Sequence, residues 1–306
     1  MNNEIRNANG LTEQEFIDTY DAGKYNDNKP SVTSDVLIFT VQSQDNAKDF
    51  NNLNDKKLKI LMVQRGDFPD INKWALPGGF IEKGETSLQA AERELQEETG
   101  IEEVYLEQLY TWDNIGRDIR DRVISISHIA LVDSTELEIK AGSDAKDARW
   151  FGVDKKITRI DKQITENGYI KHKYIDLCLI NEDIKIKGEV RETITVKGRA
   201  RKVKLEVLNK KNSQIAFDHA MMIYYGLQRL KNKVEYTDIA FNLLPELFTI
   251  AEAHKIFELT TGIEYTNQNF RKRFDHMMIE TNETSKKYSP RPAKLYKLNI
   301  NWDDEE

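Results

Sequence analysis

Short apolar runs and alternating apolar and polar positions dominate the first two thirds of the chain, and this pattern predicts β-strands. We expect strands at 31–41, 58–64, 104–112, 123–132 and 148–151. From 170 to 207 the alternation repeats, with Gly188 and Gly198 between the runs. These later runs predict further antiparallel strands, which either belong to the same sheet or form a contact between two copies of the chain.

Helical spacing of apolar residues predicts helices at 11–20, 87–98 and 216–233, and the Asn- and Asp-rich stretch 43–57 predicts an exposed loop. Another helix begins at Thr249, which forms a capping-box pattern with Glu252, and ends near residue 262.

A following helix, capped by Thr266 or Asn267, is expected to reach about residue 278. Two helices joined by a short turn are typical of a helix-turn-helix, and the basic segment 285–298 predicts a hairpin, or wing, beside them. The predicted fold is therefore a mixed sheet between helices, in residues 1–212, followed by a winged helix in residues 213–306.

Charge supports this division, since the two parts of the chain differ in sign. The net charge of the whole chain is −7. Residues 1–170 hold 21 Lys and Arg against 32 Asp and Glu, whereas residues 171–302 hold 24 against 16. A basic C-terminal part is typical of a nucleic-acid-binding domain.

Composition excludes two other classes of protein. The single cysteine, Cys178, rules out an internal disulfide and fits a reducing, cytoplasmic environment. No apolar stretch approaches the roughly 20 residues of a membrane span, and the first ten residues lack the apolar core of a signal peptide.

The predicted helix at 87–98 gathers carboxylates on one face. Glu94, Glu97 and Glu98 are three and four residues apart, so their side chains share a stripe. Like charges at this spacing repel, unless a cation lies between them. Mg²⁺, which prefers oxygen ligands and shares them with substrate phosphates, fits this stripe, with Mn²⁺ as the alternative.

Flanking residues complete the candidate site. Glu85 lies on the loop before the helix, Arg93 is placed to pair with a carboxylate such as Glu85, and Gly78 and Gly79 allow the backbone to come close to the metal. Without this context, the stripe would be an ordinary solvated acidic face.

Residues 79–101 fit the pattern G-x5-E-x7-R-E-L-x-E-E-x-G-I at every fixed position, and this stretch is identified as the signature of the Nudix hydrolases. The resemblance implies that Glu94, Glu97 and Glu98 bind the metal, that Glu85 assists them, and that Arg93 orients a carboxylate. It also implies cleavage of a nucleoside diphosphate linked to another group, by attack of water on the diphosphate.

Which residue acts as general base differs among Nudix families. A box glutamate, Glu97 or Glu98, is one source, and the loop carboxylates Asp144 and Asp147 are another. Phe80, Tyr110 and Trp112 are candidates for stacking on a nucleobase, with ordinary core packing as the alternative.

The resemblance extends beyond the box. Segments 20–25 and 29–36 resemble the start of two-domain proteins related to ADP-ribose pyrophosphatases, which makes ADP-ribose the expected substrate. The segment 117–122 resembles a family stretch that ends in Pro-Arg-Gly-Arg, but it has Ile119 and Asp121 at the Pro and Gly positions. Three arginines there are candidate diphosphate contacts, with strand-edge ion pairing to Asp118 and Asp121 as the alternative: Arg117, Arg120 and Arg122.

Segments 236–249 and 291–296 resemble the winged-helix half of Nudix-related transcriptional regulators of NAD metabolism. In such proteins the Nudix half often senses ADP-ribose or a sugar. A recognition helix presents its early residues to base edges, and the wing meets phosphates. Six residues are candidate DNA contacts: Asn267, Arg271, Lys272, Arg273, Lys287 and Arg291.

Two functions therefore stand side by side. The chain is expected to be a metal-dependent Nudix pyrophosphohydrolase, or a ligand-responsive DNA-binding regulator that uses the Nudix fold as a sensor. Intact carboxylates favour the first, and the basic winged helix favours the second. A regulator of this kind is expected to be a homodimer that binds a palindromic site on double-stranded DNA.

Overall fold

A computed structural model describes residues 6–303, apart from 8, 22, 24, 25, 27, 44–51, 101–103, 134–144, 183 and 288–290. The elements are α1 (Glu13–Thr19), β1 (Ser31–Ser43), η2 (Leu53–Asp55), β2 (Lys56–Arg65), β3 (Trp74–Ala75), β4 (Gly78–Phe80), α2 (Ser87–Thr99), β5 (Tyr105–Trp112), β6 (Val123–Leu131), β7 (Ala145–Thr165), β8 (Gly168–Asn181), β9 (Ile184–Lys197), β10 (Ala200–Leu208), α3 (His219–Val234), η4 (Ile239–Leu243), β11 (Phe248–Thr249), α4 (Ile250–Thr261), α5 (Asn267–Phe274), η5 (Asp275–Met277), β12 (Met278–Ser285) and β13 (Ala293–Leu298).

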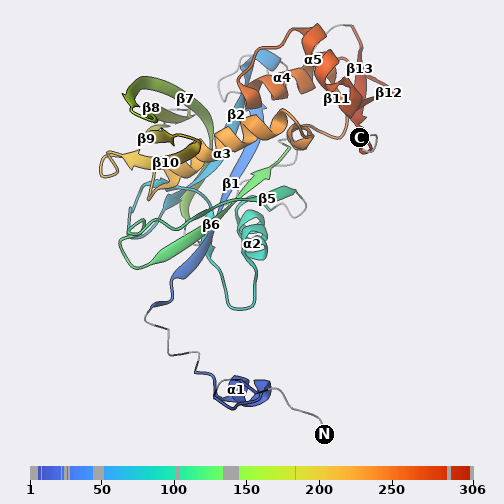
Figure 1. The fold of residues 1–306 in the computed structure, drawn as a ribbon. Coiled ribbons are helices and arrows are strands. Elements are labelled where there is room, and N and C mark those ends of the chain that lie inside the picture. Colours follow the sequence, from blue (N-terminus) through green and yellow to red (C-terminus); the bar gives the residue numbers. More distant parts are fainter. Residues whose placement is uncertain are drawn as a thin grey trace.

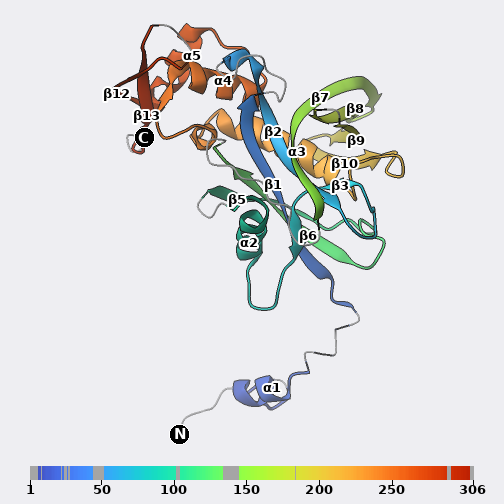
Figure 2. The same cartoon turned by 180° about the vertical axis from the view of Figure 1, so that it is seen from behind.

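One sheet organises the first part of the chain, in the order β10-β9-β8-β7-β2-β1-β6-β5. β1 and β6 run parallel, and the other pairs along this path are antiparallel. Successive side chains of β1 point to opposite faces of the sheet, so Val36 and Ile38 lie on the side of α2, and Leu37 and Phe39 lie on the side of α3. The mixed sheet between helices is therefore confirmed (Figures 1 and 2).

The strands predicted at 170–207 belong to the same sheet. β7, expected only at 148–151, runs through 21 residues and continues past β2, where it pairs with β8. β9 and β10 follow as successive hairpin strands. The alternating pattern predicted these strands, but it underestimated the length of β7, because Ile157, Ile160 and Ile164 in its outer half are three and four residues apart and do not alternate.

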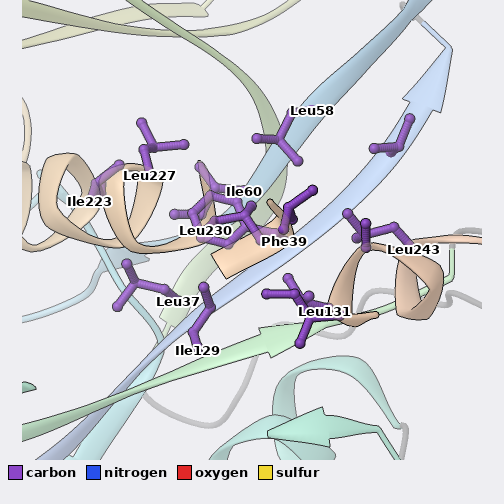
Figure 3. Packing of buried hydrophobic residues seen from close by; sticks show 14 of the residues in the cluster. Leu37, Phe39, Leu58, Ile60, Ile129, Leu131, Ile223, Leu227, Leu230 and Leu243 are labelled. Atoms are coloured by element: carbon purple, nitrogen blue, oxygen red, sulfur yellow. The ribbon is translucent and has the colours of Figure 1, made fainter. Parts of the chain in front are cut away.

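α3 lies directly against the sheet. Gly226 in its middle has no side chain, and a Cβ there would clash with Leu37 of β1. The close approach lets Ile223, Leu227 and Leu230 pack on the strands, as Figure 3 shows. The same hydrophobic cluster continues through η4 to Phe257 and Phe270 of the winged helix.

α4, α5 and a three-stranded sheet, β11-β13-β12, form the C-terminal winged helix. Thr249 caps α4 in a capping box with Glu252, as the sequence predicts, and Thr266 caps α5. The expected end of α5 near residue 278 is wrong, because the helix stops at Phe274. The chain then turns through η5 to place Met277 and Met278 in the core, and the wing hairpin begins at residue 278 rather than 285.

The start of α3 also differs from its prediction at residue 216. Phe217 has φ +51°, a left-handed value that a right-handed helix does not accept, so the helix begins at His219. The predicted boundary at 212/213 lies in this connection between β10 and α3.

Candidate functional site

A cavity of about 640 Å³ lies beside the carboxyl-rich helix α2. Its walls come from β1, from the end of β2 and the loop after it, from α2 with the preceding glycine loop, from the segment 117–123, and from the start of α3. Sequence-predicted residues that line it are Gly78, Gly79, Arg93, Glu94, Glu97, Glu98, Arg117 and Arg120.

Arg93 organises the acidic wall. Its guanidinium pairs with Glu85 at 3.1 Å, with Glu94 at 2.7 Å and with Glu97 at 3.6 Å. The pairing with Glu85, predicted from the sequence, lowers the pKa of Glu85 and raises that of Arg93. Glu85 therefore lies behind Arg93 and holds it, while Glu97 stays half exposed at the cavity.

Glu94 is a buried carboxylate of the box, next to Gly79. Its side chain is only 12% exposed, and a Cβ at position 79 would displace the carboxylate from its present position. Burial raises the pKa of Glu94, although the Arg93 charge opposes the shift. The buried Asp35 of β1, which accepts a hydrogen bond from Ser125, adds to the negative charge nearby.

Replacing Glu94 by glutamine is expected to raise the melting temperature of the metal-free protein. Because burial raises the folded-state pKa of Glu94, the ionised carboxylate costs stability above that pKa and not below it. The gain is therefore expected at pH 8 and should disappear as the pH falls through the raised pKa. Thermal denaturation of both proteins between pH 4 and pH 8 measures this, and an equal effect at all pH values would contradict it.

Within the described residues, no group of three or more His, Cys, Asp or Glu side chains is already arranged to hold a metal ion. The ion pairs of Arg93 explain this, because they occupy oxygens of Glu85, Glu94 and Glu97. The donors nevertheless suit a hard divalent cation: Glu94, Glu97 and Glu98 offer only carboxylate oxygens, and the buried Glu94 lacks full charge compensation.

Arginines also line the cavity. Arg65 and Arg120 both lie over the ring of Phe217, with Cζ 4.7 and 5.9 Å from its centroid. Arg120 also pairs with Asp118 at 2.8 Å. Burial, together with the neighbouring charge of Arg120, lowers the pKa of Arg65. Two guanidinium groups held close together create a strong attraction for an anion.

His219, the first residue of α3, closes the cavity at its base. The amide N–H of Leu76 donates to Nδ1 at 2.9 Å, so the ring proton is on Nε2, which lies 3.7 Å from an oxygen of Asp35. Burial lowers the pKa of His219, which keeps the ring neutral. His219 thus presents a single N–H donor beside Asp35 and the glycine loop.

Other predicted residues lie elsewhere. Arg122 bonds the carbonyl of Asn114 and does not line the cavity. Phe80 is at the cavity, whereas Trp112 is buried and donates to Ser127, and Tyr110 packs against it. Asp147 pairs with Arg149 outside the cavity, and Asp144 lies outside the described residues.

Among the cavity residues that sequence reasoning missed are Asp35, Arg65, Phe217 and His219. Asp35 could have been predicted from the sequence, since it is a charged residue inside an apolar strand pattern. The other three gave no local signal, because only the fold brings the end of β2 and the start of α3 to the box.

The winged helix presents part of the predicted DNA-binding set. Asn267, Arg271 and Lys272 are exposed on α5, and Phe270 and Phe274 anchor that helix in the core. Arg273 instead turns back to Glu235 at the end of α3, at 3.3 Å. In the wing, Lys287 lies 3.5 Å from Glu252 of α4, and Arg291 is exposed.

Comparison with protein families agrees with both halves. Residues 50–170 match the NUDIX domain, and residues 240–298 match the NrtR DNA-binding winged helix domain. The chain therefore combines a Nudix domain with an NrtR-type winged-helix domain.

Individual relatives point to the same organisation. An ADPR responsive transcriptional repressor, NtrR, of Acinetobacter baylyi is 27% identical over 95% of this chain and 90% of its own length. The ADP-ribose pyrophosphatase of Methanocaldococcus jannaschii is 41% identical over 100 residues, which are 33% of this chain and 58% of the relative. The crystal structure of a MutT/nudix family protein from Enterococcus faecalis aligns over 94% of each chain, with a TM-score of 0.64 and 28% identity.

No helix among the described residues is long and apolar enough to cross a membrane.

Proposed function

We propose that this protein binds a nucleoside diphosphate of the ADP-ribose class in its Nudix cavity, hydrolyses it, and uses its binding to control the attachment of the winged helix to DNA. One observation carries the proposal: carboxylates that suit a divalent metal and a group of arginines line the same cavity. A diphosphate is the ligand whose charge and size fit between the two.

In the hydrolytic role, Glu94, Glu97 and Glu98 would hold Mg²⁺ or Mn²⁺, which supplies charge neutralisation at the phosphates when it is bound. Arg65 and Arg120 orient the far side of the diphosphate. Arg93 fixes the glutamates, and its own position is fixed by Glu85. Glu97 is the side chain best placed to receive a proton from water, since it lines the cavity and remains half exposed.

In the regulatory role, Asn267, Arg271 and Lys272 contact bases and phosphates, with Lys287 and Arg291 on the wing as phosphate contacts. Two findings support this role: the match to a DNA-binding winged helix, and the similarity to a repressor along nearly the whole chain. A homodimer on a palindromic site, in the cytoplasm, is the form in which we propose that it acts.

The test is release of AMP from ADP-ribose by the purified full chain, with Mg²⁺ and with EDTA. We expect release only with the metal. If the protein binds ADP-ribose but releases no AMP, it is a sensor and not a hydrolase. If it neither binds ADP-ribose nor releases AMP, ADP-ribose is not its ligand.

Binding to DNA is tested separately, by selection of duplexes from a random library with the full chain. Enrichment of a two-fold symmetric sequence is expected, and an unenriched pool after repeated rounds would contradict the regulatory role.

A further inference from the structure

The segment Phe217-Asp218-His219 joins the ligand cavity to the helix that carries the winged domain. Phe217 and His219 line the cavity directly. Phe217 keeps its left-handed backbone because its N–H donates to Asp70 at 2.8 Å, and strained backbone of this kind concentrates at functional positions. No motif of the Nudix box accounts for these three residues.

The hydrogen-bond partner of the Asp218 side chain is unusual for its position. It stands at the N-cap of α3, where an aspartate normally accepts a hydrogen bond from the first turn, yet its side chain makes no such bond. Its carboxylate instead accepts two hydrogen bonds from Arg117, at 3.0 and 2.8 Å, in a buried ion pair. Arg117 also lines the cavity, so it is within reach of a bound anion.

α3 carries this connection to the other end of the molecule. Sixteen residues at 1.5 Å each span about 24 Å. Leu230 and Val234 in its last turns belong to the same core as Phe257 of α4 and Phe270 of α5. Glu235, just after the helix, holds Arg273 of the candidate recognition helix at 3.3 Å.

We infer that Asp218 is a two-position switch through which the ligand controls the winged helix. Without ligand, Asp218 holds Arg117. When a nucleoside diphosphate binds, Arg117 turns to the phosphates and Asp218 is released to cap α3. The resulting change in the first turn of α3 passes along this packed helix to α4 and α5. This inference rests on the proposed function, since it needs both a ligand and DNA.

The quantity to measure is a coupling factor, which is the Kd for DNA with saturating ADP-ribose divided by the Kd without it. Fluorescence anisotropy of a labelled, selected duplex gives both values, with EDTA present so that ADP-ribose is not consumed. We expect a factor of about 5 to 150 for the natural chain, the usual range of coupling between two sites. Calorimetry of ADP-ribose binding, with and without DNA, must return the same factor.

Two independent changes test the switch. The pair Arg117→Gln with Asp218→Asn removes both buried charges together, so that neither is left unpaired. Phe217→Gly removes the ring and suits the left-handed backbone. Each is expected to bring the coupling factor to within about twofold of 1. The pair Arg191→Gln with Glu206→Gln is the matched control: it removes an Arg–carboxylate ion pair joining β9 and β10, outside the cavity, and its factor at saturation should remain that of the natural chain.

The outcomes are distinguishable. If the natural chain shows coupling and both variants, folded by circular dichroism, keep it, the switch is wrong and the proposed function stands. If the Arg191→Gln, Glu206→Gln control loses the coupling as fully as they do, the loss is not specific to Asp218, which also overturns the switch. A natural chain that binds ADP-ribose and DNA without coupling overturns the switch and the ligand-controlled role together.

Discussion

Glu97→Gln is expected to lower the rate of AMP release from ADP-ribose by about 10²–10³-fold, the usual loss when one preorganised polar group at a reaction centre is removed. Glu97 is half exposed, and its ion pair with Arg93 is long at 3.6 Å. The substitution therefore removes a charge from the cavity without leaving a buried group unpaired. Initial rates at saturating Mg²⁺ and ADP-ribose give the comparison.

Glu92→Gln is the matched control for that measurement. Glu92 is on the same helix, is exposed, and lies outside the cavity. It should retain full activity, and DNA binding by the ligand-free Glu97→Gln protein should equal that of the natural chain. Unchanged turnover in Glu97→Gln would remove this glutamate from the catalytic assignment.

Arg271→Ala together with Lys272→Ala is expected to weaken binding to the selected duplex by at least about 10-fold and to flatten its salt dependence. A side chain that reads a base contributes about 1–3 kcal/mol, and each lost phosphate contact reduces the salt slope by about one. Both side chains are exposed on α5, while Phe270 and Phe274 keep the helix in place.

Lys202→Ala, at the exposed tip of β10, controls for loss of basic charge as such. Its affinity for DNA should match that of the natural chain between 50 and 200 mM salt, concentrations over which phosphate contacts dominate the effect. If the α5 variant also keeps the natural affinity and slope, α5 is not the recognition helix.

The acidic half of the site was accessible from sequence because it is local. Glu94, Glu97 and Glu98 share a helical face by spacing alone, and Arg93 with Glu85 needs only the loop that the glycines allow. The strands of the sheet could be predicted for a similar reason, because buried and exposed positions give each strand a local pattern of apolar and polar residues. The length of β7 and the end of α5 could not be predicted from the sequence, because tertiary packing sets both.

The cationic half could not be found in this way. Arg65, Arg117 and Phe217 are far apart in the chain, and only the closed fold brings them together. The sequence predicts Arg117 as a diphosphate contact, but its ion-pair partner Asp218 is 101 positions away in the chain. Likewise, the charge of Arg273 predicts a DNA contact, but its side chain is turned toward Glu235 at the end of α3.

The continuous core described above has a genetic consequence. Leu37 of the central strand and Phe257 of the winged helix belong to one cluster, with α3 between them. Damage to packing beneath the nucleotide cavity therefore loosens the DNA-binding half as well. Mutations that abolish regulation should therefore be found throughout the central strands and α3, at positions that contact neither nucleotide nor DNA. Such mutations should reduce nucleotide binding and DNA binding together.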